Sequence, residues 1–251
     1  MKRYFITLSY NGKNYVGWQI QPNGLSVQEA LQHALSVILR EPVEVVGAGR
    51  TDAGVHAHKM VAHFDLPGTD LDATKLVRNL NSFLPRDISV QAIREVRPDA
   101  HARFSAISRT YKYYLTTEKD PFLADLALRL FFEPDIDAMN RLCEVLKEYE
   151  EFTSFSRLHT DVKSNICHIR EAFWEQSGSH YTFTITANRF LRNMVRAIVG
   201  TLLLAGRGKL DEAGFRKIIE AKDRRAAGES APGHALFLHD VVYPEEIWMV
   251  E

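Results

Sequence analysis

Hydrophobic and polar residues alternate in several short stretches of the chain, which is the pattern of β-strands with one buried face. The first stretch covers residues 4–9, where Tyr4, Ile6 and Leu8 share one face, and it ends at the turn-forming pair Asn11-Gly12. Further alternation and short apolar runs predict strands at residues 43–46, 60–64, 88–90, 108–114, 166–174, 181–187 and 236–238. Residues 177–179, Ser-Gly-Ser, predict a hairpin turn between two of them.

Apolar residues at three- and four-residue spacing predict helices between these strands. The first helix follows the capping box Ser26-Val27-Gln28-Glu29 and ends before Pro42. Other helical stripes lie at residues 76–84, 139–149, 191–202 and 215–219. We expect Asp135 or Asp137 at the start of the third helix, and Asn188 and Gly206 at the two ends of the fourth. This combination of strand and helix patterns predicts an α+β fold.

Composition sets broad limits on the class of protein. The chain has 251 residues, enough for one large domain or for two that share a core, and its 45% hydrophobic content is that of an ordinary globular protein. Because the first five residues lead straight into a strand pattern and no apolar run could span a bilayer, we expect neither a signal peptide nor a membrane segment. Cys143 and Cys167 fit buried thiols in a reducing cytoplasm.

The formal net charge of −1 is unusual for a nucleic-acid binder, so any RNA surface must concentrate its basic residues. One candidate is the fourth predicted helix, where Arg189, Arg192 and Arg196 would line one face with no acidic residue between them. A second is the strand at 108–114: Arg109, Tyr111 and Tyr113 share one face, and Thr110, Lys112 and Tyr114 share the other. Interleaved basic and aromatic residues are typical of surfaces that stack bases, although a tyrosine-rich core strand is the alternative.

The stretch with the most distinctive chemistry is Gly47-Ala48-Gly49-Arg50-Thr51-Asp52-Ala53-Gly54-Val55-His56-Ala57. Glycines permit backbone conformations and close approaches that other residues avoid. The stretch therefore predicts a tight loop between two buried strands that holds Asp52 forward. A plain turn in which Asp52 only braces the loop is the simpler interpretation. His56, His58 and His63 follow, but no cysteine pair or nearby carboxylate completes a metal-ligand set, so we expect no metal site.

Three segments resemble the tRNA pseudouridine synthase A (TruA) family. They are the loop at 49–57, the strand segment Ser108–Tyr114, and Phe190-Leu191-Arg192-Asn193-Met194-Val195-Arg196. The resemblance extends in order over essentially the whole chain. It departs at Arg192-Asn193, where many family members carry histidines.

The resemblance implies roles for particular residues. Asp52 is the catalytic carboxylate, acting as a nucleophile or as a base; Arg196 is its basic partner, and Tyr111 stacks on the uracil and assists proton removal. RNA or substrate contacts are expected from Arg50, Arg109, Lys112, Arg189, Arg192 and Leu236.

The resemblance also implies the reaction and its setting. A cytoplasmic enzyme would isomerise uridine to pseudouridine at positions 38, 39 and 40 of the tRNA anticodon stem-loop, with no metal or other cofactor and as a homodimer. Its pseudouridine synthase fold would have two similar halves, residues 1–105 and 106–251, whose antiparallel sheets meet at a central basic cleft. Two rivals remain: a non-catalytic RNA-binding module, and a carboxylate-dependent hydrolase of small nucleosides, which would not need so large an arginine face.

Overall fold

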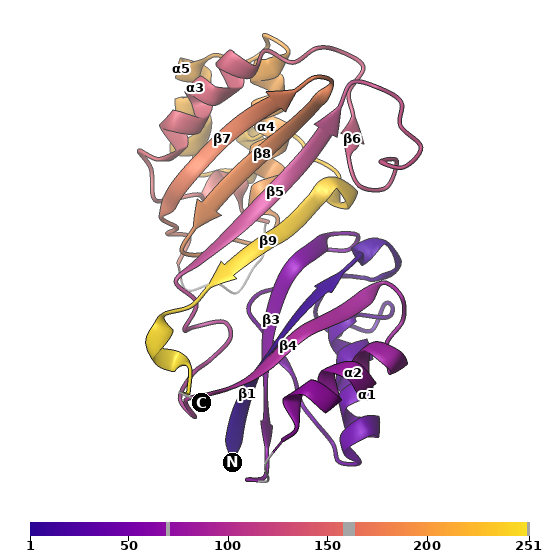
Figure 1. The fold of residues 1–251 in the computed structure, drawn as a ribbon. Coiled ribbons are helices and arrows are strands. Elements are labelled where there is room, and N and C mark those ends of the chain that lie inside the picture. Colours follow the sequence, from indigo (N-terminus) through magenta and orange to yellow (C-terminus); the bar gives the residue numbers. More distant parts are fainter. Residues whose placement is uncertain (69–70, 158–163, 250–251) are drawn as a thin grey trace. The chain divides into compact units, whose positions relative to one another are not determined.

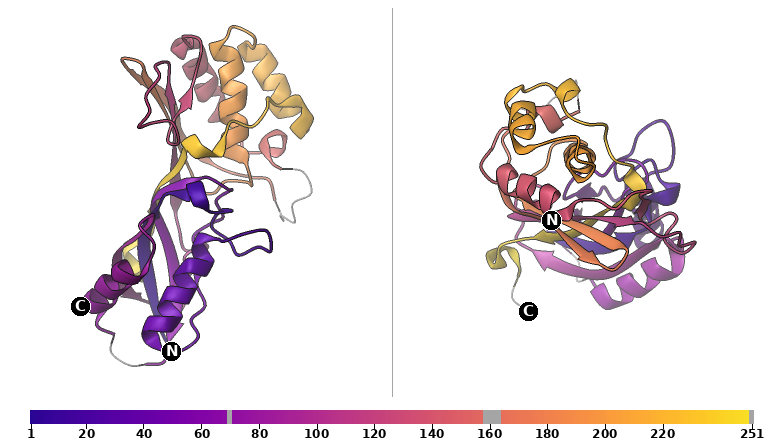
Figure 2. Two further views of the ribbon diagram at one scale, coloured as in Figure 1. Left: turned by 90° about the vertical axis from the view of Figure 1, so that its right-hand side faces the viewer. Right: turned by 90° about the horizontal axis from the view of Figure 1, so that it is seen from above.

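A computed structural model describes residues 1–68, 71–157 and 164–249. The chain forms two compact units (Figures 1 and 2). The first consists of residues 1–108 and 238–251, and the second of residues 109–237. Each unit contains antiparallel strand pairs and its own helices, so the α+β class predicted from the sequence is confirmed.

The sheet of the first unit is built on β1 (Lys2–Tyr10). This strand lies between β3 (His56–Leu66) and β4 (Ile88–Val96) and pairs antiparallel with both. The short strand β2 (Val46–Gly47) pairs with β3. Helix α2 (Ala73–Phe83) packs against β4 and contacts α1 (Val27–Leu39). The part of the predicted capping box that Ser26 supplies is confirmed, because the Ser26 hydroxyl accepts a hydrogen bond from the Glu29 amide at 3.1 Å.

The end of the chain returns to the first unit through the last residues of β9 (Leu236–Val242) and the segment that follows. The Ile107 amide donates to the Val242 carbonyl at 2.8 Å, and the Arg97 amide donates to the Ile247 carbonyl at 2.9 Å. The Tyr243 hydroxyl donates to the Ala102 carbonyl at 2.6 Å. These bonds hold the segment between β4 and the second unit in place.

The sheet of the second unit has the strand order β5 (Ser108–Thr116), β8 (His180–Ala187) and β7 (Ile169–Ser177), with β6 (Leu128–Arg129) paired to β5. Helices α3 (Ile136–Leu146), α4 (Met194–Gly206) and α5 (Glu212–Glu220) lie on one side of it (Figures 1 and 2). The predicted hairpin is confirmed as β7 and β8, which meet at Gly178.

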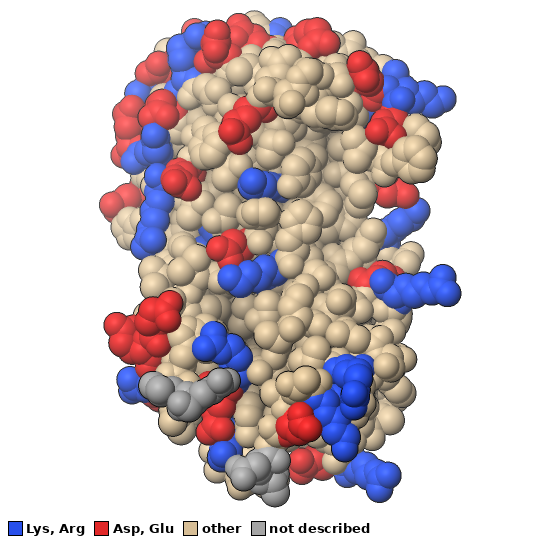
Figure 3. Space-filling view, viewed as in Figure 1, with Lys and Arg blue, Asp and Glu red and all other residues tan. Residues whose placement is uncertain are grey.

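The two faces of this second sheet differ in character. On the helix side, Trp174 and Phe183 stack with ring centroids 5.0 Å apart, and both are buried. The other face presents alternate residues of β8, Thr182, Thr184 and Thr186, and carries few charged side chains (Figure 3). Cys143 and Cys167 are free and buried as predicted, and burial raises the pKa of the Cys167 thiol to about 11.

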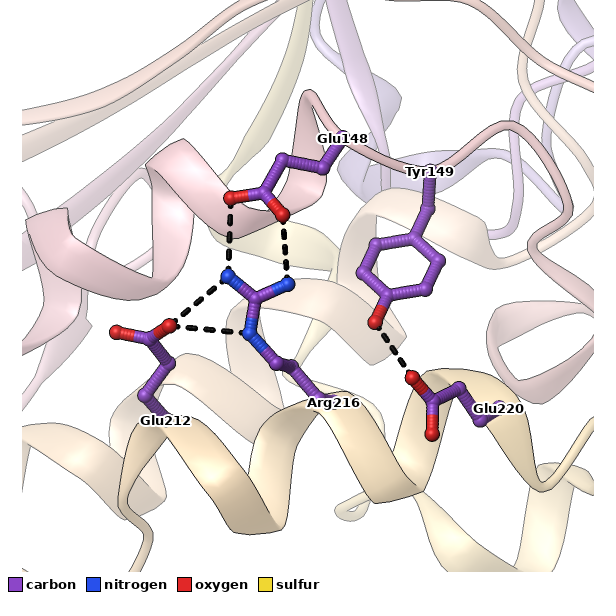
Figure 4. A network of polar contacts seen from close by, with 5 residues as sticks. All are labelled: Glu148, Tyr149, Glu212, Arg216 and Glu220. Atoms are coloured by element: carbon purple, nitrogen blue, oxygen red, sulfur yellow. Dashed lines mark hydrogen bonds and ion pairs between the residues drawn. The ribbon is translucent and has the colours of Figure 1, made fainter.

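An arginine joins helix α5 to the segment that follows α3 in the second unit (Figure 4). Arg216 on α5 donates to both oxygens of Glu148, which follows α3, at 2.6 and 2.9 Å, and also to Glu212 at 2.9 and 3.0 Å. Beside it the Tyr149 hydroxyl donates to Glu220 at 2.7 Å. Two-point arginine–carboxylate pairs fix geometry well, so the charge of Arg216 is used within the fold.

Candidate active site

The Asp52 loop, residues 48–55, connects β2 with β3 as the sequence predicted. Backbone hydrogen bonds hold it against the segment that follows β1: the Trp18 amide donates to the Thr51 carbonyl, and the Gly54 amide donates to the Tyr15 carbonyl, both at 3.3 Å. Within the loop the Val55 amide donates to the Asp52 carbonyl at 3.1 Å. The backbone is therefore fixed on both sides of Asp52.

Two glycines outside the loop make this close approach possible. A Cβ on Gly12 would lie 2.0 Å from the Val55 carbonyl oxygen, and a Cβ on Gly17 would lie 2.2 Å from the Thr51 carbonyl oxygen. Gly17 also has a φ of +110°, which side chains with a Cβ avoid. No larger residue fits either position without moving the loop that carries Asp52.

Side-chain hydrogen bonds also hold Thr51 of this loop and Tyr15, whose carbonyl accepts from the loop. The Thr51 and Tyr10 hydroxyls lie 2.9 Å apart and are hydrogen-bonded. The Tyr15 hydroxyl donates to Asp87 at 2.6 Å, and burial together with this carboxylate raises the pKa of Tyr15. Asp52 itself is half-buried, whereas Arg50 is exposed.

The three histidines after the loop have structural partners. Nδ1 of the buried His56 accepts from the Gly12 amide at 3.0 Å, and Nδ1 of the buried His63 accepts from the Ala102 amide at 3.1 Å. The exposed His58 faces His239, with their Nδ1 atoms 3.2 Å apart. Among the described residues, no group of three or more His, Cys, Asp or Glu side chains is arranged to hold a metal ion.

Tyr111, Tyr113 and Arg196 belong to the second unit, whereas Asp52 belongs to the first. The half-buried Tyr111 meets Phe190 edge-to-face, with ring centroids 5.2 Å apart. The buried Tyr113 hydroxyl donates to the Pro232 carbonyl at 2.9 Å. Burial raises the pKa of Tyr113, and the positive charge of Arg196 opposes that shift.

Arg196 lies in the first turn of α4, and its Nε donates to the Ala231 carbonyl at 2.7 Å. In return, the Ala231 amide donates to the Arg196 carbonyl at 3.0 Å. Tyr113 and Arg196 thus bind the carbonyls of two consecutive residues, Pro232 and Ala231. One segment of chain fixes both side chains.

We call residues 228–231 the α4 strap. The Gly228 amide donates to the Thr201 hydroxyl at 3.0 Å, and the Ser230 hydroxyl accepts from Asn193 at 2.6 Å. Gly200 permits the contact, because its Cβ would lie only 1.8 Å from the Glu229 carbonyl oxygen. The strap consequently fixes the direction of the Arg196 guanidinium.

The prediction that Arg189 and Arg192 share a helix face with Arg196 is wrong. Helix α4 begins at Met194, after an N-cap at Asn193 rather than at Asn188. The Asn188 side chain instead accepts from the His168 amide at 2.8 Å. Asn193 has a φ of 66°, a left-handed conformation that asparagine tolerates better than most residues. The chain therefore turns sharply between Arg189 and the helix.

The remaining predicted contacts lie on β5 and β9. Arg109 donates to the Asn188 carbonyl at 2.8 Å and, like Tyr111, lies on the helix side of β5. Lys112 alternates to the opposite face, across from Thr184. Leu236 is buried and begins β9.

These arginines fall into two groups, according to whether a carboxylate pairs with the guanidinium. Arg3 binds Asp65 through two hydrogen bonds of 2.7 Å, and Arg216 binds two glutamates. In contrast, within the described part of the chain, no ion pair or side-chain hydrogen bond is formed by Arg50, Arg189 or Arg192. Their guanidinium groups keep all five donors for a ligand.

Sequence reasoning missed the supporting roles of Gly12, Gly17, Gly200 and Ser230. Gly200 carried one signal, since it lies in the middle of a strong helical pattern. Glycine weakens helices, and at such a position it often marks a close contact. Gly17 and Ser230 lie in loops, where glycine and serine are ordinary, and the Asn11-Gly12 pair indicated a turn but not the contact with Val55.

Comparison with known proteins identifies the family to which the chain belongs. The chain matches the tRNA pseudouridine synthase family over residues 6–105 and 149–244. It is 61% identical to tRNA pseudouridine synthase A of Parabacteroides distasonis over 251 residues, the whole of both chains. It is 60% identical to that of Bacteroides thetaiotaomicron over 254 residues, which cover all of this chain and 94% of the relative. Similarity to that of Exiguobacterium sp. is 37% identity over 243 residues, 97% of this chain and 98% of the relative. The chain therefore belongs to the tRNA pseudouridine synthase family, enzymes that isomerise uridine in tRNA.

Proposed function

We propose that this enzyme converts uridine to pseudouridine at positions 38, 39 and 40 of the tRNA anticodon stem-loop, with Asp52 as the catalytic carboxylate. The observation that carries the proposal is the backbone support of the Asp52 loop at Thr51 and Gly54. Catalytic groups act best when they are held in place before the substrate arrives.

The reaction breaks the bond between the sugar C1′ and N1 of uracil and forms one between C1′ and C5. The proton on C5 leaves to solvent, and N1 gains one, so the composition of the nucleoside is unchanged. Asp52 serves either as a nucleophile or as a base that removes a sugar proton. In both roles the carboxylate must be ionised and close to the sugar and to C6.

Tyr111 and Arg196 serve the same reaction from the second unit. Tyr111 stacks on the uracil and assists removal of the C5 proton; its half-buried ring, held against Phe190, is consistent with this role. Arg196 acts as the basic partner of the carboxylate, and the bond from its Nε to Ala231 fixes its direction. Leu236 contributes an apolar surface for the base.

A uridine inside a stem must leave the stack before it reacts. Extrusion costs a few kcal/mol, and stacking on one aromatic ring returns roughly 1–3 kcal/mol per base. Tyr111 offsets much of that cost, and Arg50 stabilises the extruded nucleotide. Arg189 and Arg192 bind phosphates, as does Arg109, while Lys112 meets a different part of the tRNA from the opposite face of β5.

The setting of the reaction follows from the same proposal. The enzyme works in the cytoplasm, where its free buried thiols remain reduced. It acts as a homodimer and without a metal or organic cofactor. No helix in the described ranges has the length and apolar character needed to cross a membrane.

Tritium release to water from tRNA labelled at uracil C5 tests this proposal. We expect release without any added cofactor, and in the presence of a chelator when monovalent salt maintains the tRNA fold. A transcript with cytidine at positions 38, 39 and 40 should release none, and restoring one uridine should restore release. Equal release from the triply replaced transcript would contradict the assigned positions, and strict dependence on a divalent ion would contradict the absence of a metal.

A further inference from the structure

The turn that precedes β5 carries an exposed aromatic ring. Phe104 keeps 75% of its surface exposed. Single exposed apolar residues are common and need no explanation by themselves. What distinguishes Phe104 is how firmly the chain around it is held.

Residues 101–105, here called the Phe104 turn, are closed by four hydrogen bonds. The Ser105 amide donates to the His101 carbonyl, and the His101 amide donates to the Ser105 hydroxyl, both at 2.9 Å. The His101 Nδ1 accepts from the amides of Arg103 and Phe104 at 3.0 and 3.4 Å. His101 can accept these bonds only while Nδ1 is unprotonated; burial and the charges of Arg3 and Arg103 lower its pKa and favour that form.

The turn rests on the sheet of the first unit. The His101 ring lies against the buried His63, with centroids 4.6 Å apart, and His63 also accepts the Ala102 amide. The Ala102 carbonyl receives the Tyr243 hydroxyl at 2.6 Å. The Phe104 ring then lies on the outer side of His101, with centroids 4.4 Å apart. The phenyl ring is thus the exposed end of a row of three rings anchored in the core.

A positive charge lies beside the exposed ring. The guanidinium carbon of Arg103 is 5.4 Å from the Phe104 ring centroid, and Arg103 is exposed. An aromatic ring next to an arginine suits single-stranded nucleic acid, because bases stack on the ring and the phosphate attracts the cation. Since ring and backbone are already fixed, little conformational entropy is lost when a nucleotide binds.

We propose that Phe104 and Arg103 form a docking point for an unpaired nucleotide of the tRNA, in which the ring stacks on a base and the guanidinium binds a phosphate. The proposal rests on the tRNA substrate of the proposed function but does not depend on which residue is the catalyst. A contact with a second copy of this chain would also cover the ring; the charge of Arg103 favours the anionic partner.

Binding of unmodified tRNA by wild-type and variant proteins tests the proposal. Phe104→Ala should weaken the tRNA Kd about 10- to 100-fold, while the single-turnover rate at saturating enzyme stays near wild type. Phe104→Trp should restore affinity, and tRNA should quench the added tryptophan fluorescence. Arg103→Gln should weaken binding and reduce the slope of log K against log salt by about 1. Phe122→Ala is the matched control, because Phe122 is 88% exposed and, in the described chain, has no ring or guanidinium packed against it.

Two results would overturn the proposal. One is a tRNA Kd for Phe104→Ala equal to that of Phe122→Ala and wild type. The other is a changed molecular mass for Phe104→Ala by light scattering with a proportionate loss of affinity, since this would assign the ring to a contact between copies. Tritium release by the wild-type enzyme reports on the proposed function separately, so failure of one does not mimic failure of the other.

Discussion

The partners of individual arginines explain how a chain of net charge −1 can bind RNA, which is a polyanion. Arg3 and Arg216 are neutralised by carboxylates within the fold. Arg189 and Arg192 have no such partner among the described residues, so their charge is open to phosphate. What matters for RNA binding is therefore which arginines lack a carboxylate, and the total charge does not report it.

This distinction predicts different effects for arginine substitutions. Arg189→Ala and Arg192→Ala should weaken tRNA binding and reduce the salt slope by about 1 each, with an unchanged single-turnover rate at saturating enzyme. Arg196→Ala should lower that rate. Arg216→Ala is the control for binding, since its charge is already paired. An equal loss of rate in the variants of Arg189, Arg192 and Arg196 would show that the division is wrong.

The lowered pKa of His63 predicts how the free energy of unfolding depends on pH. Burial and the charge of Arg3 lower its pKa to about 4 in the folded protein, against an unfolded value near 6.5. Between these values the unfolded chain binds the proton more readily, so the contribution of His63 is complete above about pH 6.5 and is lost as the pH falls to about 4, by roughly 3 kcal/mol. His63→Asn keeps an acceptor for the Ala102 amide but cannot titrate. Urea unfolding from pH 7.5 to 4 should therefore show a shallower loss in the variant, and parallel losses would contradict the prediction.

At the scale of elements, α4 and its strap decide where Arg196 points. A helix interior normally favours alanine over glycine by about 1 kcal/mol. At Gly200 the opposite should hold, because an added methyl would lie 1.8 Å from the Glu229 carbonyl oxygen. The strap would have to move, and the bond from Arg196 to Ala231 would lengthen or break.

Gly200→Ala should accordingly destabilise the protein by about 1–3 kcal/mol and lower the single-turnover rate at saturating enzyme, with little change in tRNA Kd. Gly68→Ala is a suitable control, because the space around the Gly68 Cβ position is open among the described residues. If Gly200→Ala is as active as wild type and more stable, helix propensity outweighs the strap and the positioning argument fails.

Element starts were predictable where a side chain caps the helix. Ser26 and Asp135 each accept a hydrogen bond from the backbone amide three residues later. The sequence identified Ser26 as a cap and narrowed the start of α3 to Asp135 or Asp137. The start of α4 was not predictable in this way, because Asn193 caps through a left-handed backbone and makes no side-chain cap hydrogen bond. The apolar periodicity continues back to Leu191, so it could not show that the chain turns before the helix begins.

At the scale of the whole chain, the structure depends on contacts between distant segments. Residues 238–249 belong to the first unit, and Gly12 and Gly17 leave space for the loop at 48–55. Periodicity and turn signals report neighbours along the sequence, so they predicted the Asp52 loop but not what holds it. The candidate catalytic residues came from resemblance to a family, whereas their supporting residues needed the coordinates.

Tritium release by the Asp52→Asn variant shows whether Asp52 is the catalytic carboxylate. Asparagine has nearly the same size and can keep the loop folded, but it is neither a nucleophilic carboxylate nor an effective base at neutral pH. We expect tritium release to fall at least about a thousandfold, equivalent to about 4 kcal/mol of barrier. The tRNA Kd should stay equal or decrease slightly, because a negative charge is removed from a surface that meets phosphates. Conversion near the wild-type rate would show that Asp52 is not the catalytic group, and joint loss of conversion and binding would show that it only braces the loop.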